Sequence, residues 1–200
     1  MRQFICLLIT LFIAQFTFAK QVPLDQKNSS IEWAGKKKFT GDIHNGTVKI
    51  KTGTINVDDA NKLVGGTIIV DMATIDDKDL SGSYKKKLED HLKSDDFFDV
   101  KNNNEASFKI TKVTPTRSNA YQVTGNMTIR GKTNPETFEV IIEKSGKKMV
   151  ATGNIEIDRT KYNVSYNQEA SLLKKAVSIT KDKIIADKIN LTLKLQTQNI

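Results

Sequence analysis

Cysteine is nearly absent from this sequence, because Cys6 is the one cysteine among 200 residues. It lies in an apolar run from Phe4 to Phe18 that follows one basic residue and ends at the small-residue pattern Thr17-Phe18-Ala19. This pattern is typical of a secretory signal peptide, and the run is too short to span a bilayer as a helix. We therefore expect residues 1–19 to be removed, leaving a periplasmic or secreted chain 20–200 with no thiol, no disulfide and no lipid anchor. That excludes a thiol-based mechanism.

Histidine is also scarce, since only His44 and His91 are present. No histidines, cysteines or carboxylates follow a metal-ligand spacing, so the sequence predicts no metal site and no cofactor. We expect a binding protein rather than an enzyme. The alternative is a secreted hydrolase or metal-dependent enzyme that uses His91 with its neighbours Asp90, Asp95 and Asp96.

Charge is not concentrated in any one region. The 31 Lys and Arg residues outnumber 23 Asp and Glu, which gives a net charge of +8, but clusters such as Lys36–Lys38 and Lys85–Lys87 alternate with acidic residues. No stripe interleaves these lysines with exposed aromatic residues, as a nucleic-acid-binding face would. We interpret the charge as a solvated exterior and expect no nucleic-acid partner. Contact with an anionic membrane is expected to be peripheral at most.

Alternation of apolar and polar residues, typical of strands with one buried face, recurs along most of the chain. Asn45-Gly46 is a dipeptide favoured in tight turns and is expected to join the first two strands. Gly65-Gly66 is expected to allow a bulge or bend, and Pro135 to open the sixth strand. The eight expected strands are 30–36, 47–57, 62–75, 106–111, 121–130, 135–143, 149–157 and 189–195.

One helix interrupts this pattern after the third strand. Apolar residues recur there every four positions, at Leu80, Tyr84, Leu88 and Leu92. This spacing predicts an amphipathic helix, with Asp77 or Asp79 as its N-terminal cap. Ser94-Asp95-Asp96 is expected to end the helix, and Phe97-Phe98 to close one end of the sheet structure as a buried plug.

Eight strands with hairpin spacing and one inserted helix predict an all-β fold, a closed or nearly closed antiparallel barrel formed by one domain over 20–200. A two-sheet sandwich is the alternative. Several strands reach ten residues or more, which favours an elongated barrel. Arg159 to Lys183 is irregular, with a short helical turn expected at Glu169–Ala176.

The predicted interior contains few large side chains. Inward positions include Gly66, Gly125, Ala151 and Gly153, and the mature chain has few aromatic rings for its length. A barrel filled so thinly has either collapsed or holds something long and apolar.

Three motifs carry a family resemblance. They are His91–Val100 (HLKSDDFFDV), Val123–Thr133 (VTGNMTIRGKT) and Ile157–Tyr162 (IDRTKY), and the run Gly66–Met72 (GTIIVDM) adds to them. Together they resemble the YceI-like polyisoprenoid-binding family, in order and over essentially the whole mature chain. The resemblance implies a lipocalin-like elongated barrel, exported from the cytoplasm, with a polyisoprenoid or other long-chain lipid in a central apolar tunnel.

The chain departs from the family pattern at two places. Lys101–Glu105 stands where the family usually has a Tyr-Pro pair, and Asn167–Lys183 lacks the glycine-rich character expected of it. The second departure concerns one end of the tunnel. Whether the chain forms a homodimer stays open.

The predicted ligand site follows from the inward positions together with the resemblance. Its tunnel residues are Trp33, Ile68, Val70, Met72, Leu92, Phe97, Phe98, Phe108, Met127, Ile129, Phe138 and Ile155. His91, Arg159 and Tyr162 are the candidates for holding a polar headgroup. For Arg159, an ion pair with a neighbouring carboxylate is an equally supported alternative.

Overall fold

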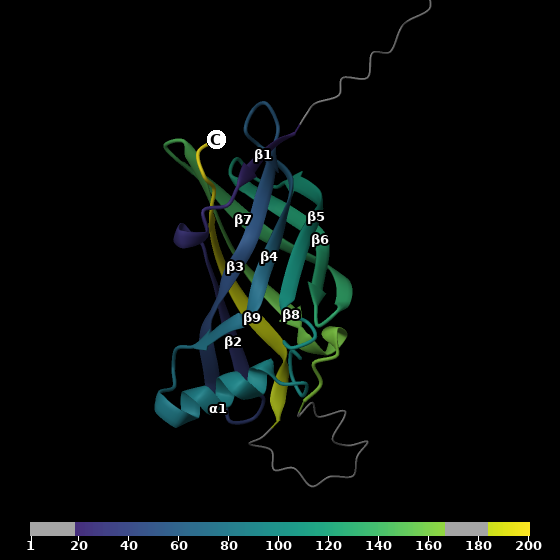
Figure 1. Ribbon diagram of the computed structural model, residues 1–200. Coiled ribbons are helices and arrows are strands. Elements are labelled where there is room, and N and C mark those ends of the chain that lie inside the picture. The colour runs from purple at the N-terminus through teal and green to yellow at the C-terminus, as the bar shows by residue number, and fades with distance from the viewer. Residues whose placement is uncertain (1–18, 167–183) are drawn as a thin grey trace, which may run out of the picture.

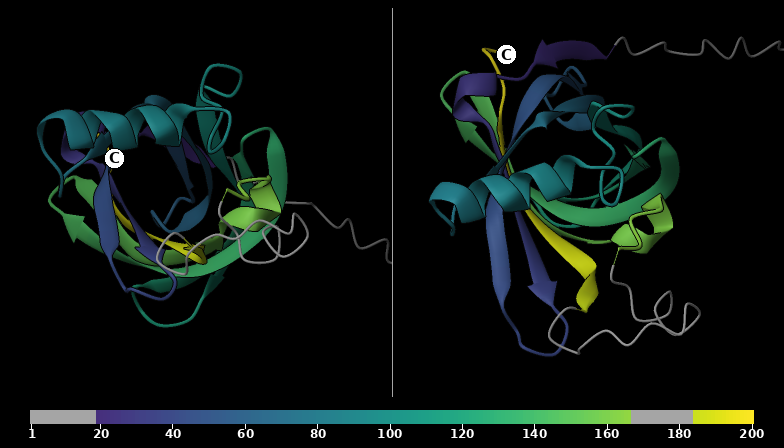
Figure 2. Two further views of the ribbon diagram at one scale, coloured as in Figure 1. Left: turned by 90° about the horizontal axis from the view of Figure 1, so that it is seen from below. Right: turned by 60° about the horizontal axis from the view of Figure 1, so that its bottom comes forward.

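The computed structural model describes residues 19–166 and 184–200. Antiparallel strands close into a barrel, and one helix lies across one end of it (Figure 1, Figure 2). The strands are β1 (Lys20–Pro23), β2 (Ser30–Lys37), β3 (Ile43–Val57), β4 (Leu63–Asp77), β5 (Glu105–Pro115), β6 (Ala120–Ile129), β7 (Lys132–Ser145), β8 (Lys148–Asp158) and β9 (Ile185–Gln196). The helix α1 (Gly82–Lys93) follows β4, and short 3₁₀ turns occur at Gln26–Asn28 and Arg159–Tyr162. The helical turn expected at Glu169–Ala176 lies outside the described residues.

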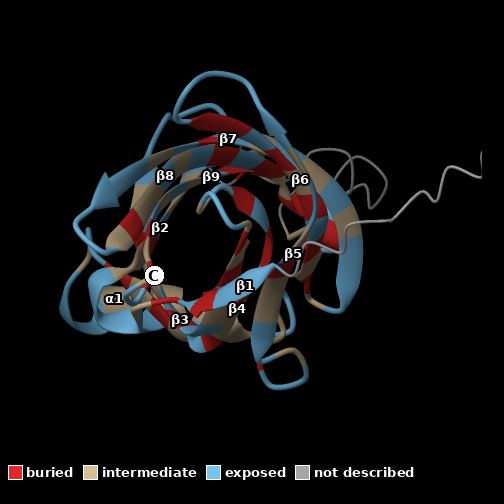
Figure 3. Ribbon diagram, turned by 90° about the horizontal axis from the view of Figure 1, so that it is seen from above, coloured by how far each residue is buried: buried red, intermediate tan, exposed pale blue. Residues whose placement is uncertain are grey.

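The eight long strands form a closed ring. Their order is β3-β2-β9-β8-β7-β6-β5-β4, and β4 pairs back onto β3. This confirms the predicted eight-stranded antiparallel barrel with one inserted helix, and it excludes the two-sheet sandwich. Because successive side chains of a strand point to opposite faces, one residue in two faces the interior, and buried positions recur all around the ring (Figure 3).

The short strand β1 is an addition that the sequence did not predict. It pairs with the end of β3 (Lys20↔Val57), whereas β2 pairs with the start of β3 (Ile31↔Val48). The two strands therefore share one edge of β3, and β1 adds no further position to the ring. Its Val22 is 1% exposed, so these few residues contribute to the core.

The prediction that Asn45-Gly46 forms the first turn was wrong. Both residues lie inside β3, paired with β2, and the chain turns at residues 38–42 instead. A side chain at position 46 would place its Cβ 2.6 Å from the ring of Trp33 and 2.1 Å from the carbonyl oxygen of Asp76. Gly46 is thus required by close packing under the tryptophan rather than by a turn.

The predicted cap of the helix was also wrong. The helix begins at Gly82, its N-cap is Ser81, and Leu80 precedes it. Asp77 instead accepts a hydrogen bond from the backbone N–H of Leu80 (2.7 Å), the residue before the N-cap. Tyr84 is 75% exposed, so the face that packs on the barrel carries Leu88 and Leu92. No helix in the described part of the chain is long and apolar enough to cross a membrane.

Strands β7 and β9 both begin earlier than predicted. A two-residue turn at Arg130-Gly131, with φ of +48° and +67°, returns the chain directly into β7, so Pro135 lies within the strand rather than at its start. Pro135 is tolerated there because β7 pairs with β8 only from Val140 onward. Strand β9 begins at Ile185 instead of Ile189.

This late pairing leaves a seam between β7 and β8 at the end of the barrel that carries α1. Side chains bridge the seam in place of backbone hydrogen bonds. The Tyr162 hydroxyl donates to Glu136 Oε1 (3.0 Å), and Asn134 Nδ2 donates to the carbonyl oxygen of Lys161 (3.0 Å). Strands β4 and β5 are also paired over only part of their lengths, Thr67–Asp71 with Glu105–Lys109.

Candidate functional site

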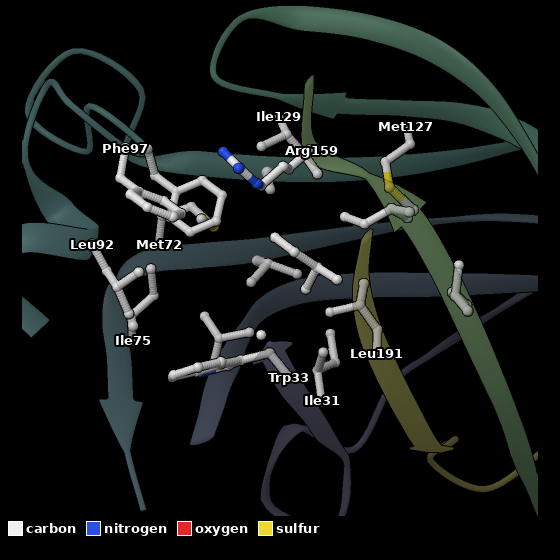
Figure 4. A pocket seen from close by; sticks show the side chains of 18 of the residues that line it. Ile31, Trp33, Met72, Ile75, Leu92, Phe97, Met127, Ile129, Arg159 and Leu191 are labelled. Carbon is white, nitrogen blue, oxygen red and sulfur yellow. The ribbon is translucent and has the colours of Figure 1, made fainter. Parts of the chain in front are cut away.

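An apolar cavity of about 520 Å³ occupies the half of the barrel nearest α1. All twelve predicted tunnel residues line it, from Trp33 in β2 to Ile155 in β8 (Figure 4). Nine of the twelve face inward because successive side chains of a strand point to opposite faces, whereas Leu92 comes from α1 and Phe97-Phe98 from the turn after it. Figure 4 shows Leu92 and Phe97 together at one end of the cavity, with Met127 and Leu191 toward the other.

A pair of aromatic rings closes the cavity on the side away from α1. The ring centroids of Phe108 and Phe138 lie 5.1 Å apart at 43°, and both residues also line a smaller cavity of about 50 Å³ beyond them. A Cβ at Gly125 would lie 2.5 Å from the Phe108 ring. Gly125 therefore gives room to that ring rather than leaving open space.

The cavity meets solvent at the tip of the β2–β3 hairpin. Among its described lining residues, Lys36 is the exposed one, and Gly35 and Lys37 line the same part. Ile185 and Ala186, at the start of β9, lie in the lining near them, since Lys37 pairs with Ile185. We refer to Gly35–Lys37 with Ile185 and Ala186 as the mouth.

Arg159 places a buried cation in the cavity lining close to the mouth. It is 1% exposed, and its guanidinium donates to the backbone carbonyls of Ala186 (2.9 Å), Val164 (2.7 Å), Tyr166 (3.0 Å) and Ile185 (3.1 Å). These bonds use four of its five N–H groups. The arginine is therefore held mainly by carbonyl oxygens and not by the ion pair considered as an alternative.

The charge of Arg159 is only weakly balanced by the protein. Its closest ion-pair partner in the described chain is Asp187, whose Oδ1 lies 3.8 Å from Nη2. Burial lowers the pKa of the guanidinium, and Asp187 and Asp158 oppose that shift. Because an arginine keeps its proton at any physiological pH, a positive charge persists at this end of the cavity. The guanidinium also lies 5.9 Å from the centre of the Phe97 ring (Figure 4).

His91 lies at the same end of the cavity. Its ring packs edge-on against Tyr166 (centroids 4.4 Å apart) and Phe97 (5.7 Å), and it lines the cavity. Its Nε2 atom is buried and has no hydrogen-bond partner. The structure thus brings together two of the three predicted headgroup residues, His91 and Arg159, although 68 positions separate them in the sequence.

The third candidate, Tyr162, lies outside the cavity lining. Its side chain is fully buried and donates its hydroxyl to Glu136 across the seam. Burial raises the pKa of this phenol, and the hydrogen bond to Glu136 adds to the rise. Tyr166 lines the cavity, whereas Tyr162 does not. No signal in the sequence indicated Tyr166, because it lies after the 3₁₀ turn at Arg159–Tyr162, where no periodic pattern shows which way a side chain points.

The enzyme alternative required carboxylates beside His91, and the structure does not place them there. Asp90 accepts from Lys86 on the outer face of the helix (2.7 Å), and Asp95 and Asp96 are exposed.

A closed antiparallel barrel with an enclosed apolar cavity and one helix across its end is the architecture of the lipocalin-like barrels. The chain belongs to the YceI-like domain family, whose sequence model matches residues 23–197. This confirms the resemblance carried by the three motifs.

The relatives agree with this assignment. A UPF0312 protein of Staphylococcus epidermidis is 34% identical over 87 residues, which cover 40% of this chain and 48% of that protein. The chain thus spans about half the length of the curated relatives it matches first. Among solved structures, BcnA of Burkholderia cenocepacia superposes with a TM-score of 0.67 at 22% identity, covering 88% of this chain and 99% of that one.

A second solved structure is described as a polyisoprenoid binding domain from Saccharophagus degradans, implicated in plant cell wall breakdown. Its TM-score is 0.62 at 10% identity, and the match covers 90% of this chain and all of that one. At such identities the likeness is one of fold.

Proposed function

We propose that this protein is exported and binds a polyisoprenoid or similar long-chain lipid inside its barrel, for carriage, storage or sensing, and that it is not an enzyme. The observation that carries the proposal is the cavity of about 520 Å³, lined almost throughout by apolar side chains. An enclosed cavity of this size is ordinary for a small-molecule site. The polyisoprenoid binding domain with the same fold supports the choice of ligand class.

The polar residues give the ligand an orientation. Arg159 and His91 lie at the end of the cavity near α1, whereas Phe108 and Phe138 close the apolar side. A lipid therefore enters tail first, with its tail against the aromatic pair and its headgroup beside the guanidinium. An anionic headgroup would balance the charge of Arg159, and an oxygen atom near Nε2 would give His91 a partner.

Extraction of the native protein tests this proposal. The protein is purified from its own host without detergent, and its organic extract is analysed by mass spectrometry. We expect one long-chain amphiphile in near-stoichiometric amount. A protein that carries no lipid from its own host, and takes up none from added polyprenyl phosphate, would contradict the proposal.

The mouth is also suited to peripheral contact with an anionic membrane, from which a lipid could enter directly. Phe39 (49% exposed) and Ile43 (54% exposed) lie at the tip of the β2–β3 hairpin beside Lys36–Lys38. By residue count the tip from Lys36 to Ile43 carries three lysines and one aspartate, Asp42, which pairs with Lys37 (3.1 Å), and Lys38 Nζ lies 5.6 Å from the centre of the Phe39 ring. Apolar side chains flanked by lysines favour insertion at the surface of an anionic bilayer.

Vesicle co-sedimentation tests this contact with a matched control. We expect Phe39→Ser with Ile43→Ser to reduce binding to phosphatidylglycerol vesicles and to slow lipid uptake from them. The control replaces Val64 and Ile141, two exposed apolar residues toward the opposite end of the barrel, and is expected to change neither. Equal effects of the two double variants would refute a role for the hairpin tip.

A further inference from the structure

A second group of polar residues, which does not include Arg159, lies where β3 and β4 meet the loop before α1. His44 in β3, Asp77 at the end of β4 and Asp79 in the loop before α1 each offer one donor atom, and these atoms lie within 4.8 Å of one another. His44 Nδ1 lies 2.8 Å from Asp79 Oδ2. The pairing of β3 with β4, which sets Gly46 opposite Asp77, brings His44 to this place. Sequence spacing gave no sign of the group, because His44 lies 33 positions before Asp77.

Asp77 is the unusual member of this group. Its side chain is fully buried, with 0% exposure, and its Oδ1 accepts one hydrogen bond from the N–H of Leu80. Its Oδ2 is buried, and in the described chain no donor group contacts it, because the neighbouring Asp79 carboxylate can pair with it only by sharing a proton. Burial raises the pKa of Asp77, and the adjacent Asp79 carboxylate adds to the rise. A buried carboxylate without a donor raises the free energy of the folded state, so a cation or a proton must compensate it.

The neighbouring lysines do not provide that compensation. Lys78 and Lys85 both pair with Asp76, and Lys85 also lies 3.7 Å from Glu89. Glu89 itself approaches Asp77 only to accept its backbone N–H (3.0 Å). Among the described residues, no lysine or arginine forms an ion pair with Asp77 or Asp79. Two carboxylates thus face one imidazole, with no fixed cation between them.

We propose that His44, Asp77 and Asp79 bind a divalent transition-metal ion, with zinc as the ion best matched to the donors. One imidazole nitrogen and two carboxylate oxygens form a mixed set that suits zinc, whereas Mg²⁺ and Ca²⁺ prefer oxygen alone. Three protein ligands leave a coordination position for water or another oxygen. The ion would take the place of the hydrogen bond between His44 and Asp79 and would give Asp77 Oδ2 a partner.

Such an ion would fasten the loop that leads into α1. The loop is already joined to β3 by two hydrogen bonds, from the N–H of Lys78 to the carbonyl oxygen of Asn45 (2.8 Å) and from the N–H of Asn45 to Asp79 Oδ1 (2.8 Å). His44 also lines the main cavity, and α1 packs against β4. Metal binding therefore stabilises the position of the helix over the end of the cavity, independently of which ligand the cavity holds.

The test uses the full mature protein, treated with a chelator and then titrated with Zn²⁺ by calorimetry. We expect one equivalent to bind, a rise in thermal unfolding temperature on adding zinc, and no competition from millimolar Mg²⁺ or Ca²⁺. Asp77→Asn and His44→Gln each remove a ligand, so each is expected to weaken zinc binding by more than the roughly 10- to 100-fold that loss of an outer-shell partner costs. His44 is only partly buried, so His44→Gln keeps the test valid if Asp77→Asn fails to fold.

Asp76→Asn is the matched control. Asp76 precedes Asp77 but pairs with Lys78 and Lys85 outside the group, so this variant is expected to keep zinc binding. X-ray absorption of the loaded protein should show nitrogen and oxygen ligands only. Absence of stoichiometric binding to the wild type, or equal losses in Asp76→Asn and His44→Gln, would overturn the proposal and leave a proton shared by the two carboxylates as the compensation. Lipid content, measured separately, reports on the proposed function alone.

Discussion

The aromatic pair that closes the main cavity sets the length of the lipid tail in the proposed complex. Phe108 and Phe138 separate the cavity of about 520 Å³ from the one of about 50 Å³ beyond it. Removing one ring joins the two spaces and adds the volume of the ring itself. Phe138 is the better target, because it is only partly buried, whereas Phe108 is 8% exposed and packs on Gly125.

We expect Phe138→Ala to destabilise the lipid-free protein more than the loaded protein. A Phe→Ala change in a tightly packed core costs about 3–5 kcal/mol, and the ring of Phe138 borders a cavity on both sides, so we expect the lipid-free protein to lose about 2–3 kcal/mol. That corresponds to a fall of roughly 4–12 °C in unfolding temperature for a chain of this size. In the loaded protein a longer tail fills the space, and the loss should shrink to about 1 kcal/mol.

The assay combines thermal unfolding, with and without extracted lipid, with mass spectrometry of the retained lipid. We expect Phe138→Ala to shift the lipid toward longer chains. Met149→Ala is the control, because Met149 is 4% exposed and lines only the smaller of these two cavities. It should destabilise the loaded and lipid-free forms equally and leave chain length unchanged. An unchanged chain length in folded Phe138→Ala, with equal losses in both forms, would refute the reasoning.

Two further predictions concern single side chains, and a third concerns the N-terminus. Phe98→Asp should fold but retain no lipid in the extraction assay, because an unpaired carboxylate cannot lie against an apolar tail. Tyr162→Phe should lower the free energy of unfolding by about 1 kcal/mol in denaturant titrations without changing lipid content. Since burial raises the pKa of Tyr162 above its ordinary value, its contribution is fully present below about pH 10 and is lost gradually as the pH rises toward the raised pKa, so wild type and Tyr162→Phe should converge in stability at high pH. N-terminal sequencing of exported protein should begin at Lys20, and retained Met1 would disprove the signal peptide.

The parts of the fold that depend on local pattern could be predicted from the sequence. Strand alternation identified the eight long strands and the inward positions on them, because the period of two is a property of each strand by itself. Leu92 followed from the four-residue spacing of the helix, and Phe97-Phe98 from two adjacent aromatic residues after its end. The family motifs placed His91 and Arg159 among the candidates for the polar end. Periodicity and motifs can be recognised in the sequence without knowing which strands and helices are in contact.

The features that could not be predicted depend on contacts between distant segments. Gly46 follows an asparagine, which predicts a turn, but the glycine is needed because the ring of Trp33 packs against its backbone. Asp77 and Asp79 precede a helical pattern and are therefore interpreted as helix caps from the sequence alone. Their proximity to His44 arises only when β3 pairs with β4, which the sequence does not show. Tyr162 belongs to the same motif as Arg159, but its hydroxyl reaches Glu136, 26 positions earlier, and not the cavity.

The seam between β7 and β8 is a place where side chains rather than backbone hydrogen bonds hold the barrel wall together. Between fully paired strands, such as β8 and β9 from Val150 to Asp158, widening the ring would break a backbone ladder. Parting β7 from β8 beside the 3₁₀ turn at Arg159–Tyr162 breaks two side-chain hydrogen bonds, each worth about 0.5–1.5 kcal/mol. In the proposed complex, this part of the wall can therefore yield to a bulky headgroup at the cost of those two hydrogen bonds, while the ladder between β7 and β8 from Val140 to Ser145 is kept.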